Sequence, residues 1–185
     1  MGSLYAKNVL GYAKPRVGVV NNGEEDTKGN ELTQGAHKLL KNTPQVNYIG
    51  FIEGRDLCQG TAQVILCDGF IGNILLKFAE GLSQFIFDSL KQEIESNLRH
   101  KLGAALLLPG LQGMKKRLDY TEYGGAPLLG VNGLCIIAHG SSNSKAIKNA
   151  IGVCAQGIST NVLQGIAQEI EQMDGDLNEG NQGES

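Results

Sequence analysis

Apolar and polar residues are arranged along this chain in two ways, as short apolar runs and as longer stretches with apolar positions three and four residues apart. The short runs predict β-strands and the spaced stretches predict amphipathic helices. The run at 62–67 is apolar almost throughout, which is typical of a strand covered on both faces. The predicted strands lie at 16–20, 46–52 and 62–67, and the predicted helices at 3–10, 31–40 and 71–90. Strands alternating with helices indicate βαβ units in a largely parallel sheet.

The last third of the chain predicts a hairpin and a long helix. Asn132 and Gly133 separate apolar runs at 128–131 and 134–138, and both residues tolerate the positive φ of a tight hairpin turn. From Ser144 an apolar stripe at helical spacing continues to Ile170 and predicts one final helix. The polar, acidic residues 174–185 predict a disordered tail after a domain of residues 1–173.

Residues 97–118 predict a helical hairpin insertion of a different character, broken at Pro109 and Gly110, with basic residues on both sides of an apolar centre. Three interpretations remain open: a subunit interface, a membrane-surface anchor, or a dock for an acidic partner. The residues that would carry carrier-protein or membrane docking are Arg99, Lys101, Leu106, Leu107, Lys115, Lys116 and Arg117.

Composition narrows the classes of function. The formal net charge of −3 over 185 residues does not favour nucleic-acid binding. The four cysteines contain no C-x-x-C pair, so we expect buried free thiols in a reducing cytoplasm and no metal site. No uninterrupted apolar run is long enough to span a bilayer. The expected location is therefore cytoplasmic.

Three glycine-containing loops each follow a predicted strand and precede a predicted helix: 21–30, 68–73 and 139–143. This order points free backbone N–H groups and the positive end of a helix at one spot, which favours anion binding. Two plainer interpretations also stand. The loop at 21–30 resembles a solvated turn, and Ser142 or Asn143 would serve only as a helix cap.

Five motifs in one order resemble the PlsX family, the bacterial acyl-acyl carrier protein:phosphate acyltransferases of phospholipid synthesis. The resemblance runs from about Met1 to Ile151. The motifs are NNGEEDTKGNE (21–31), EGRD (53–56), CDGFIGNILLK (67–77), LDYTEYGGAPLLGVNG (118–133) and AHGSSNSKAIKNAI (138–151).

The resemblance implies that an acyl-carrier protein and inorganic phosphate give an acyl phosphate and free carrier. It implies a three-layer α/β/α sandwich, similar to isopropylmalate dehydrogenase and phosphotransacetylase, with its N-terminal part missing here. It further implies a homodimer with no cofactor and no obligatory metal, and allows a peripheral contact with the inner face of the membrane. Two competing interpretations are a phosphotransacetylase-like enzyme acting on acyl-coenzyme A and a non-catalytic fragment that binds carrier protein or membrane.

The reaction needs groups that hold phosphate and stabilise an oxyanion on the thioester carbonyl. His139, Lys77 and Lys28 are the predicted catalytic residues, with His139 as a proton donor and the lysines as neutralising charges. Acyl carrier protein is acidic, which makes the basic segment the expected dock. The predicted phosphate- and substrate-binding residues are Asn22, Gly23, Asp68, Gly72, Asn73, Gly124, Gly125, Gly140, Ser141 and Ser142.

Overall fold

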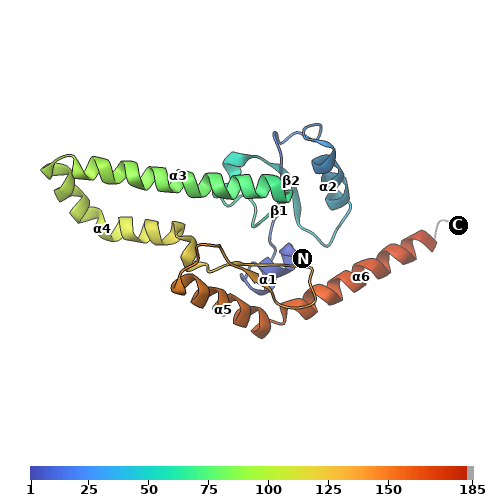
Figure 1. The fold of residues 1–185 in the computed structure, drawn as a ribbon. Coiled ribbons are helices and arrows are strands. Elements are labelled where there is room, and N and C mark those ends of the chain that lie inside the picture. The colour runs from blue at the N-terminus through green and yellow to red at the C-terminus, as the bar shows by residue number, and fades with distance from the viewer. Residues whose placement is uncertain (183–185) are drawn as a thin grey trace.

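A computed structural model describes residues 1–182 of the chain, with side chains described for residues 1–172. Within that range it is a mixed α/β structure of two small sheets and six α-helices (Figure 1). The strands are β1 (Val17–Val20), β2 (Tyr48–Ile52), β3 (Val64–Leu66), β4 (Ala126–Pro127) and β5 (Ile136–Ile137). The helices are α1 (Gly2–Asn8), α2 (Glu31–Lys41), α3 (Gly69–Glu95), α4 (Leu98–Leu118), α5 (Ser144–Ser159) and α6 (Val162–Gln182), with single 3₁₀ turns at Gly54–Cys58 and Tyr120–Glu122.

The larger sheet has the strand order β2-β1-β3, with all strands parallel, so the predicted parallel sheet is confirmed. Val19 in the central strand and Ile52 in β2 are buried, and α2 packs against both strands. The prediction that β3 is covered on both faces is wrong for the described chain. Ile65 and Leu66 remain 38% and 42% exposed, because apart from its paired strand β1 this edge strand is covered mainly by α1.

The predicted hairpin within 97–118 is wrong. Pro109 lies inside the continuous helix α4, and the hairpin is formed by α3 and α4 together, with its turn at Ser96 and Asn97. Figure 1 shows this pair extending away from the sheet, with α4 bending partway along. A proline removes one backbone hydrogen bond, which permits a bend without ending the helix.

Apolar side chains along both helices of the hairpin face solvent in the described chain, Phe78 at 66% and Leu106 at 85% exposure among them. By length and composition α3 could cross a bilayer, whereas the sequence predicted no such span. That criterion is weak, since a long helix that packs against another protein segment meets it equally well.

The final apolar stripe forms two helices instead of the single predicted helix. The chain turns between α5 and α6 at Asn161, whose φ of +50° is left-handed. Val162 and Ile166 then pack against Val9 in a small core. The predicted tail at 174–185 overlaps α6 as far as Gln182, and its last three residues lie outside the described residues.

The second sheet confirms the predicted hairpin topology, because β4 and β5 pair antiparallel. The strands are shorter than predicted, and only Ala126–Pro127 and Ile136–Ile137 pair as a ladder. One further hydrogen bond joins the Leu128 N–H to the Cys135 carbonyl at 2.8 Å. The reversal is therefore wider than a two-residue Asn-Gly turn, and Gly130 shares the positive φ with Gly133.

Candidate functional site

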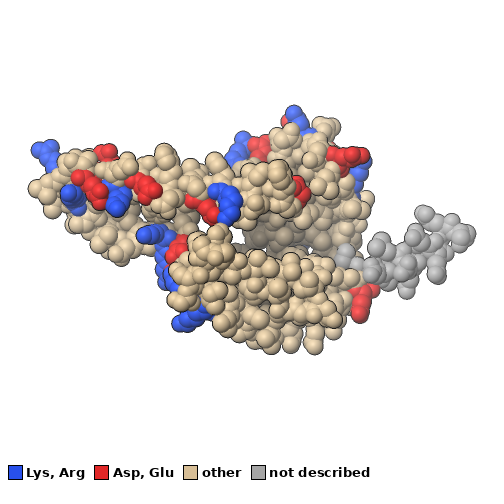
Figure 2. All heavy atoms as spheres, in the orientation of Figure 1, with Lys and Arg blue, Asp and Glu red and all other residues tan. Residues whose placement is uncertain are grey.

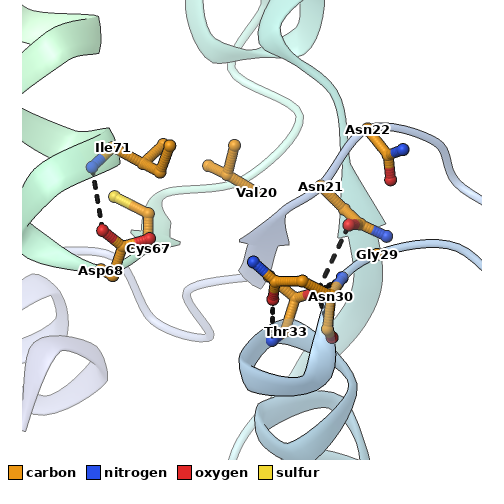
Figure 3. A pocket seen from close by; sticks show the side chains of 9 residues that line it. All are labelled: Val20, Asn21, Asn22, Gly29, Asn30, Thr33, Cys67, Asp68 and Ile71. Carbon is orange, nitrogen blue, oxygen red and sulfur yellow. Dashed lines mark hydrogen bonds between the residues drawn. The ribbon is translucent and has the colours of Figure 1, made fainter.

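A pocket of about 480 Å³ lies at the carboxyl ends of β1 and β3, between the starts of α2 and α3. We call it the sheet-edge pocket (Figure 3). Ligands of parallel α/β sheets commonly bind at this edge. In Figure 3 the side chains of Val20 and Ile71 point toward one another across it. Its lining residues are Val20, Asn21, Asn22, Gly29, Asn30, Thr33, Cys67, Asp68 and Ile71.

Amides and a hydroxyl supply most of the polar lining. The Asn21 amide donates to the Gly23 carbonyl at 3.1 Å, and the Thr33 hydroxyl lies 3.4 Å from the Asn21 side-chain oxygen. Asn30 caps α2 by accepting from the Thr33 N–H at 2.9 Å. Burial, followed by the charge of Asp68, raises the pKa of the Cys67 thiol, which disfavours a thiolate nucleophile here.

The start of α3 does not offer the free N–H groups that the sequence predicted. Asp68 accepts hydrogen bonds from the N–H groups of Phe70 and Ile71, both at 2.9 Å, and the Gly72 N–H donates to the Asp68 carbonyl at 2.9 Å. The helix therefore carries its own anion, the Asp68 carboxylate. Of the predicted binding residues, Asn22 and Asp68 line the pocket, while Gly72 and Asn73 lie in the first turn of α3.

Lys28 is the cation nearest in sequence to this pocket, since the next residue, Gly29, lines it. The Lys28 side chain lies across Gly23: a Cβ atom at Gly23 would come within 3.0 Å of the Lys28 Cγ. No acidic side chain of the described residues forms an ion pair with Lys28. The Glu25 carboxylate lies on the same side, since its Oε2 would be 2.7 Å from a Cβ atom at Gly23.

A second group joins α3 to the loop after β5. The Lys77 ammonium lies 2.9 Å from His139 Nε2 and 2.8 Å from the Glu80 carboxylate. The Ser141 hydroxyl lies 2.6 Å from His139 Nδ1 and 3.2 Å from the Tyr120 hydroxyl. We call these five residues the His139 chain.

The charge of Lys77 decides the His139 tautomer. An ammonium group only donates, so Nε2 accepts and the ring proton lies on Nδ1, where it donates to the Ser141 hydroxyl. The longer 3.2 Å approach of the Ser141 N–H to Nδ1 would need that atom to accept, so the 2.6 Å contact is the hydrogen bond. In this arrangement Lys77, with one N–H still free, is the outward donor. The sequence assigned that role to His139.

Two adjoining hollows, of about 390 and 440 Å³, run from the His139 chain along the space between α3 and α4. Gln84, Phe87 and Lys115 line both, so they form one groove, here called the helix-pair groove. His139, Ser141 and Lys115 are predicted site residues that meet in it. The sequence did not assign a role to Tyr120 or Glu80.

The loop after β5 confirms the capping interpretation. The Ser142 N–H donates to the His139 carbonyl at 2.9 Å, and Asn143 accepts from the Ala146 N–H at 3.0 Å to cap α5. Gly140 is exposed, and the Ser142 hydroxyl is buried without a hydrogen-bond partner among the described residues. The predicted cluster of free N–H groups at 140–142 is therefore largely occupied by the loop itself.

Gly124 and Gly125 serve close packing. A Cβ atom at Gly124, whose φ is +77°, would lie 2.2 Å from the Ala150 N atom. At Gly125 it would lie 2.6 Å from the Ile137 carbonyl oxygen. Both glycines let the chain approach α5 and β5, and their predicted contact with substrate stays a prediction.

The predicted site residues thus form two groups and not one cluster. A helix turns about 100° per residue, so Ile71 in the sheet-edge pocket and Lys77 in the His139 chain project from different sides of α3. Among the described residues no group of three or more His, Cys, Asp or Glu side chains could hold a metal ion.

The predicted docking residues are also separated. Arg99 and Lys101 lie at the start of α4, and Lys115, Lys116 and Arg117 lie at its end, about 24 Å away along the axis. Figure 2 shows basic side chains at the free end of the hairpin and again near the body of the molecule. Only the second set is beside the His139 chain, through Lys115.

Comparison with known proteins settles the family. The family model described as "Fatty acid synthesis protein" matches residues 1–165. The chain belongs to the PlsX family. It is 54% identical over 170 residues to the phosphate acyltransferase of Heliobacterium modesticaldum, covering 92% of this chain and 50% of that protein.

Two further PlsX relatives give the same picture. The phosphate acyltransferase of Moorella thermoacetica is 54% identical over 163 residues, covering 88% of this chain and 48% of that protein. The phosphate acyltransferase of Brevibacillus brevis is 51% identical over 171 residues, covering 92% of this chain and 51% of that protein. The chain therefore spans about half the length of these PlsX proteins.

Proposed function

We propose that this chain carries the phosphate site of an enzyme that converts a long-chain acyl-acyl carrier protein and inorganic phosphate into an acyl phosphate and free carrier protein. The acyl phosphate would feed phospholipid synthesis. The observation that carries the proposal is Lys28, without an ion-pair partner among the described residues, next in the chain to Gly29 of a pocket whose lining includes Asn21, Asn22, Asn30 and Thr33, in a chain 54% identical to a phosphate acyltransferase.

The reaction needs no strong general base, because phosphate is already an anion near neutral pH. A phosphate oxygen attacks the thioester carbonyl carbon, the C–O bond forms, and the C–S bond breaks as the sulfur leaves with its electron pair. Lys28 would hold the phosphate in the sheet-edge pocket. Lys77 belongs to the other group, and its third N–H, without a partner among the described residues, would hold the carrier-bound thioester where it enters the helix-pair groove. Glu80 and His139 fix the direction of the Lys77 ammonium.

The carrier protein is proposed to dock at the end of α4 nearest the body. Acyl carrier protein is acidic, and Lys115, Lys116 and Arg117 are consecutive basic residues in the last turn of α4. Lys115 also lines the helix-pair groove beside His139. The apolar part of that groove suits the acyl chain attached to the carrier.

The same proposal includes the three-layer α/β/α fold related to isopropylmalate dehydrogenase and phosphotransacetylase, a homodimer, and a cytoplasmic protein with peripheral contact at the inner face of the membrane. The exposed β3 and α3 side chains support it, because they leave apolar surface for further layers or a second subunit to cover. The chain spans about half of its relatives, so the missing half would supply the rest of the cleft.

The test is acyl phosphate formation from long-chain acyl-carrier protein and inorganic phosphate. It should be run with this chain and with a longer form that includes the segment present in the relatives. The proposal expects turnover in the longer form and preference for the carrier thioester over the coenzyme A thioester. Equal use of coenzyme A would favour a phosphotransacetylase-like enzyme. Carrier binding without turnover in either form would favour a non-catalytic binding module.

A further inference from the structure

Side chains on one face of α2 bind the loop at 21–30. The Gln34 amide donates to the backbone carbonyl of Asp26 at 2.7 Å and also to that of Lys28. Two turns along, Lys41 donates to the Asp26 carboxylate at 3.0 Å. Gln34, His37 and Lys41 are spaced three and four residues apart, so they share one side of the helix. Together these three side chains hold Asp26 and Lys28, the residues on either side of Thr27.

His37 lies at the centre of this face and is buried, with only 6% of its surface exposed. Its ring stacks on Phe51 at 4.6 Å, and its Nδ1 lies 2.8 Å from the Tyr48 hydroxyl. Its Nε2 lies 3.5 Å from the Asp26 carboxylate. A ring protonated on Nε2 suits both contacts: its N–H nitrogen lies 3.5 Å from the Asp26 carboxylate, longer than an ordinary hydrogen bond, and Nδ1 accepts from the Tyr48 hydroxyl. The sheet is thus connected to the loop through one imidazole.

We propose that His37 is a positioning residue: through Asp26 it holds the loop against α2, so that Lys28, the residue before Gly29 of the sheet-edge pocket, stays in place and inorganic phosphate binds there. The inference rests on the proposed function, which supplies the phosphate. It adds a residue that touches neither phosphate nor thioester and acts through the loop that carries Lys28.

The electrostatics of the group agree with this role. The hydrogen bond from Lys41, followed by its charge, lowers the pKa of Asp26, so the carboxylate is ionised at neutral pH. Burial raises the pKa of Tyr48, and the charge of Asp26 raises it further. Tyr48 therefore stays a neutral hydroxyl that can donate to His37.

The test uses amide hydrogen exchange and phosphate titration followed by NMR on the intact chain. The most informative probe is the Lys28 N–H, which donates to the Glu25 carbonyl at 2.9 Å inside the loop. His37→Phe keeps the ring packing and loses both nitrogen contacts. Asp26→Asn, on the surface, leaves the core untouched. We expect either change to speed exchange at Lys28 and to weaken phosphate binding, each by roughly three- to tenfold.

Two further variants separate positioning from general stability. His37→Gln places an amide nitrogen near the position of Nε2, so we expect it to restore both readouts, whereas His37→Asn, which replaces the Nδ1 side, does not. Lys38→Ala, on the same helix and without a hydrogen bond or ion pair among the described contacts, is the matched control and leaves both unchanged. In an enzyme form with turnover, we expect the KM for phosphate to rise while kcat and the KM for the acyl thioester stay unchanged.

The inference is overturned if the Lys28 N–H exchanges at the parent rate in both Asp26→Asn and His37→Phe. It is also overturned if these variants lower kcat and leave the KM for phosphate unchanged. If the unaltered chain binds no phosphate, the proposed function fails on its own, and the exchange rates still decide whether His37 holds the loop. Faster exchange with weaker phosphate binding, both restored by His37→Gln, supports the inference.

Discussion

The loop before α2 and the loop before α5 both follow a strand and lead into a helix, yet they use their polar groups in opposite ways. In the loop before α5 most polar groups are occupied: the Ser142 N–H bonds within the loop, Asn143 caps the helix, and His139 is held by Lys77 and Ser141. The loop before α2 is held by side chains of the following helix, and its Lys28 has no ionic partner among the described residues.

The difference teaches that a strand–loop–helix order does not by itself make an anion site in this protein. Asn30, Asp68 and Asn143 each cap the helix that follows, so the positive helix ends are already neutralised by oxygen atoms of the chain. Anion recognition therefore depends on lysine side chains. Which lysines are free, and how firmly their loops are held, becomes the question to test.

The largest expected effect comes from Gly29→Ala, which would break the loop before α2. Gly29 has a φ of +102°, and a Cβ atom there would lie 2.3 Å from the Thr33 hydroxyl and 2.5 Å from the Asn21 side-chain oxygen. We expect a loss of about 3 kcal/mol in the free energy of unfolding, measured by urea denaturation. Gly35→Ala, in open space on α2, is the control and should stabilise by about 0.5–1 kcal/mol.

Lys77→Met would break the His139 chain instead. It removes the proposed contact with the carrier-bound thioester and leaves Glu80 without its partner. We expect the KM for the acyl-acyl carrier protein to rise by roughly tenfold in the enzyme form with turnover, with a small change in stability. Lys148→Met, on the exposed part of α5, is the matched control. Equal activity of the two variants would remove Lys77 from the mechanism.

The two basic ends of α4 can be compared by matched charge reversals. Lys115→Glu with Lys116→Glu should weaken binding of acyl carrier protein by roughly tenfold at low salt, measured by calorimetry. Arg99→Glu with Lys101→Glu, about 24 Å away along the helix, should leave that affinity nearly unchanged. The opposite ranking would place the dock at the free end of the hairpin.

The smallest expected effect is on the pH dependence of the free energy of unfolding, through Asp119 at the start of the 3₁₀ turn after α4. Hydrogen bonds from Thr121, and then the charge of Lys145, lower the pKa of Asp119. A carboxyl with a lowered folded-state pKa stabilises the fold above its unfolded pKa of about 3.9, and this contribution is lost as the pH falls through the folded value.

We therefore expect Asp119→Asn to lower the free energy of unfolding at about pH 6 and to lower it by less at about pH 3. Urea unfolding at the two pH values measures this. Asp88→Asn on α3 is the control. A difference between variant and parent that is the same at both pH values would contradict the assignment.

Much of the fold follows from local pattern, and the errors have local causes. β1 and β2 were predictable because β-branched and aromatic residues fill them except at Gly18 and Gly50. The break at Pro109 was wrong because a proline can stay inside a helix. The turn at Asn161 was missed because no glycine or proline marks it in the sequence, and only its positive φ reveals it.

The candidate site was predictable residue by residue but not in its grouping. Lys77 and Glu80 are three residues apart on a helix, so their pairing could be expected. His139 is 62 residues from Lys77, and no periodicity in the sequence predicts that contact. His37 was missed for the same reason, because a lone histidine in an amphipathic helix has no sequence feature that indicates its neighbours.

The small core around Val9 and Val162 has a consequence for synthesis on the ribosome. The Gln156 amide donates to the Val9 carbonyl across 147 residues, and Val9 packs in a cluster with Val162 and Ile166 of α6. At bacterial elongation rates the ribosome needs on the order of ten seconds to make the intervening chain. Until α6 has been made, Val9 lacks these two buried partners, so we expect nascent chains to expose that apolar surface to chaperones and proteases.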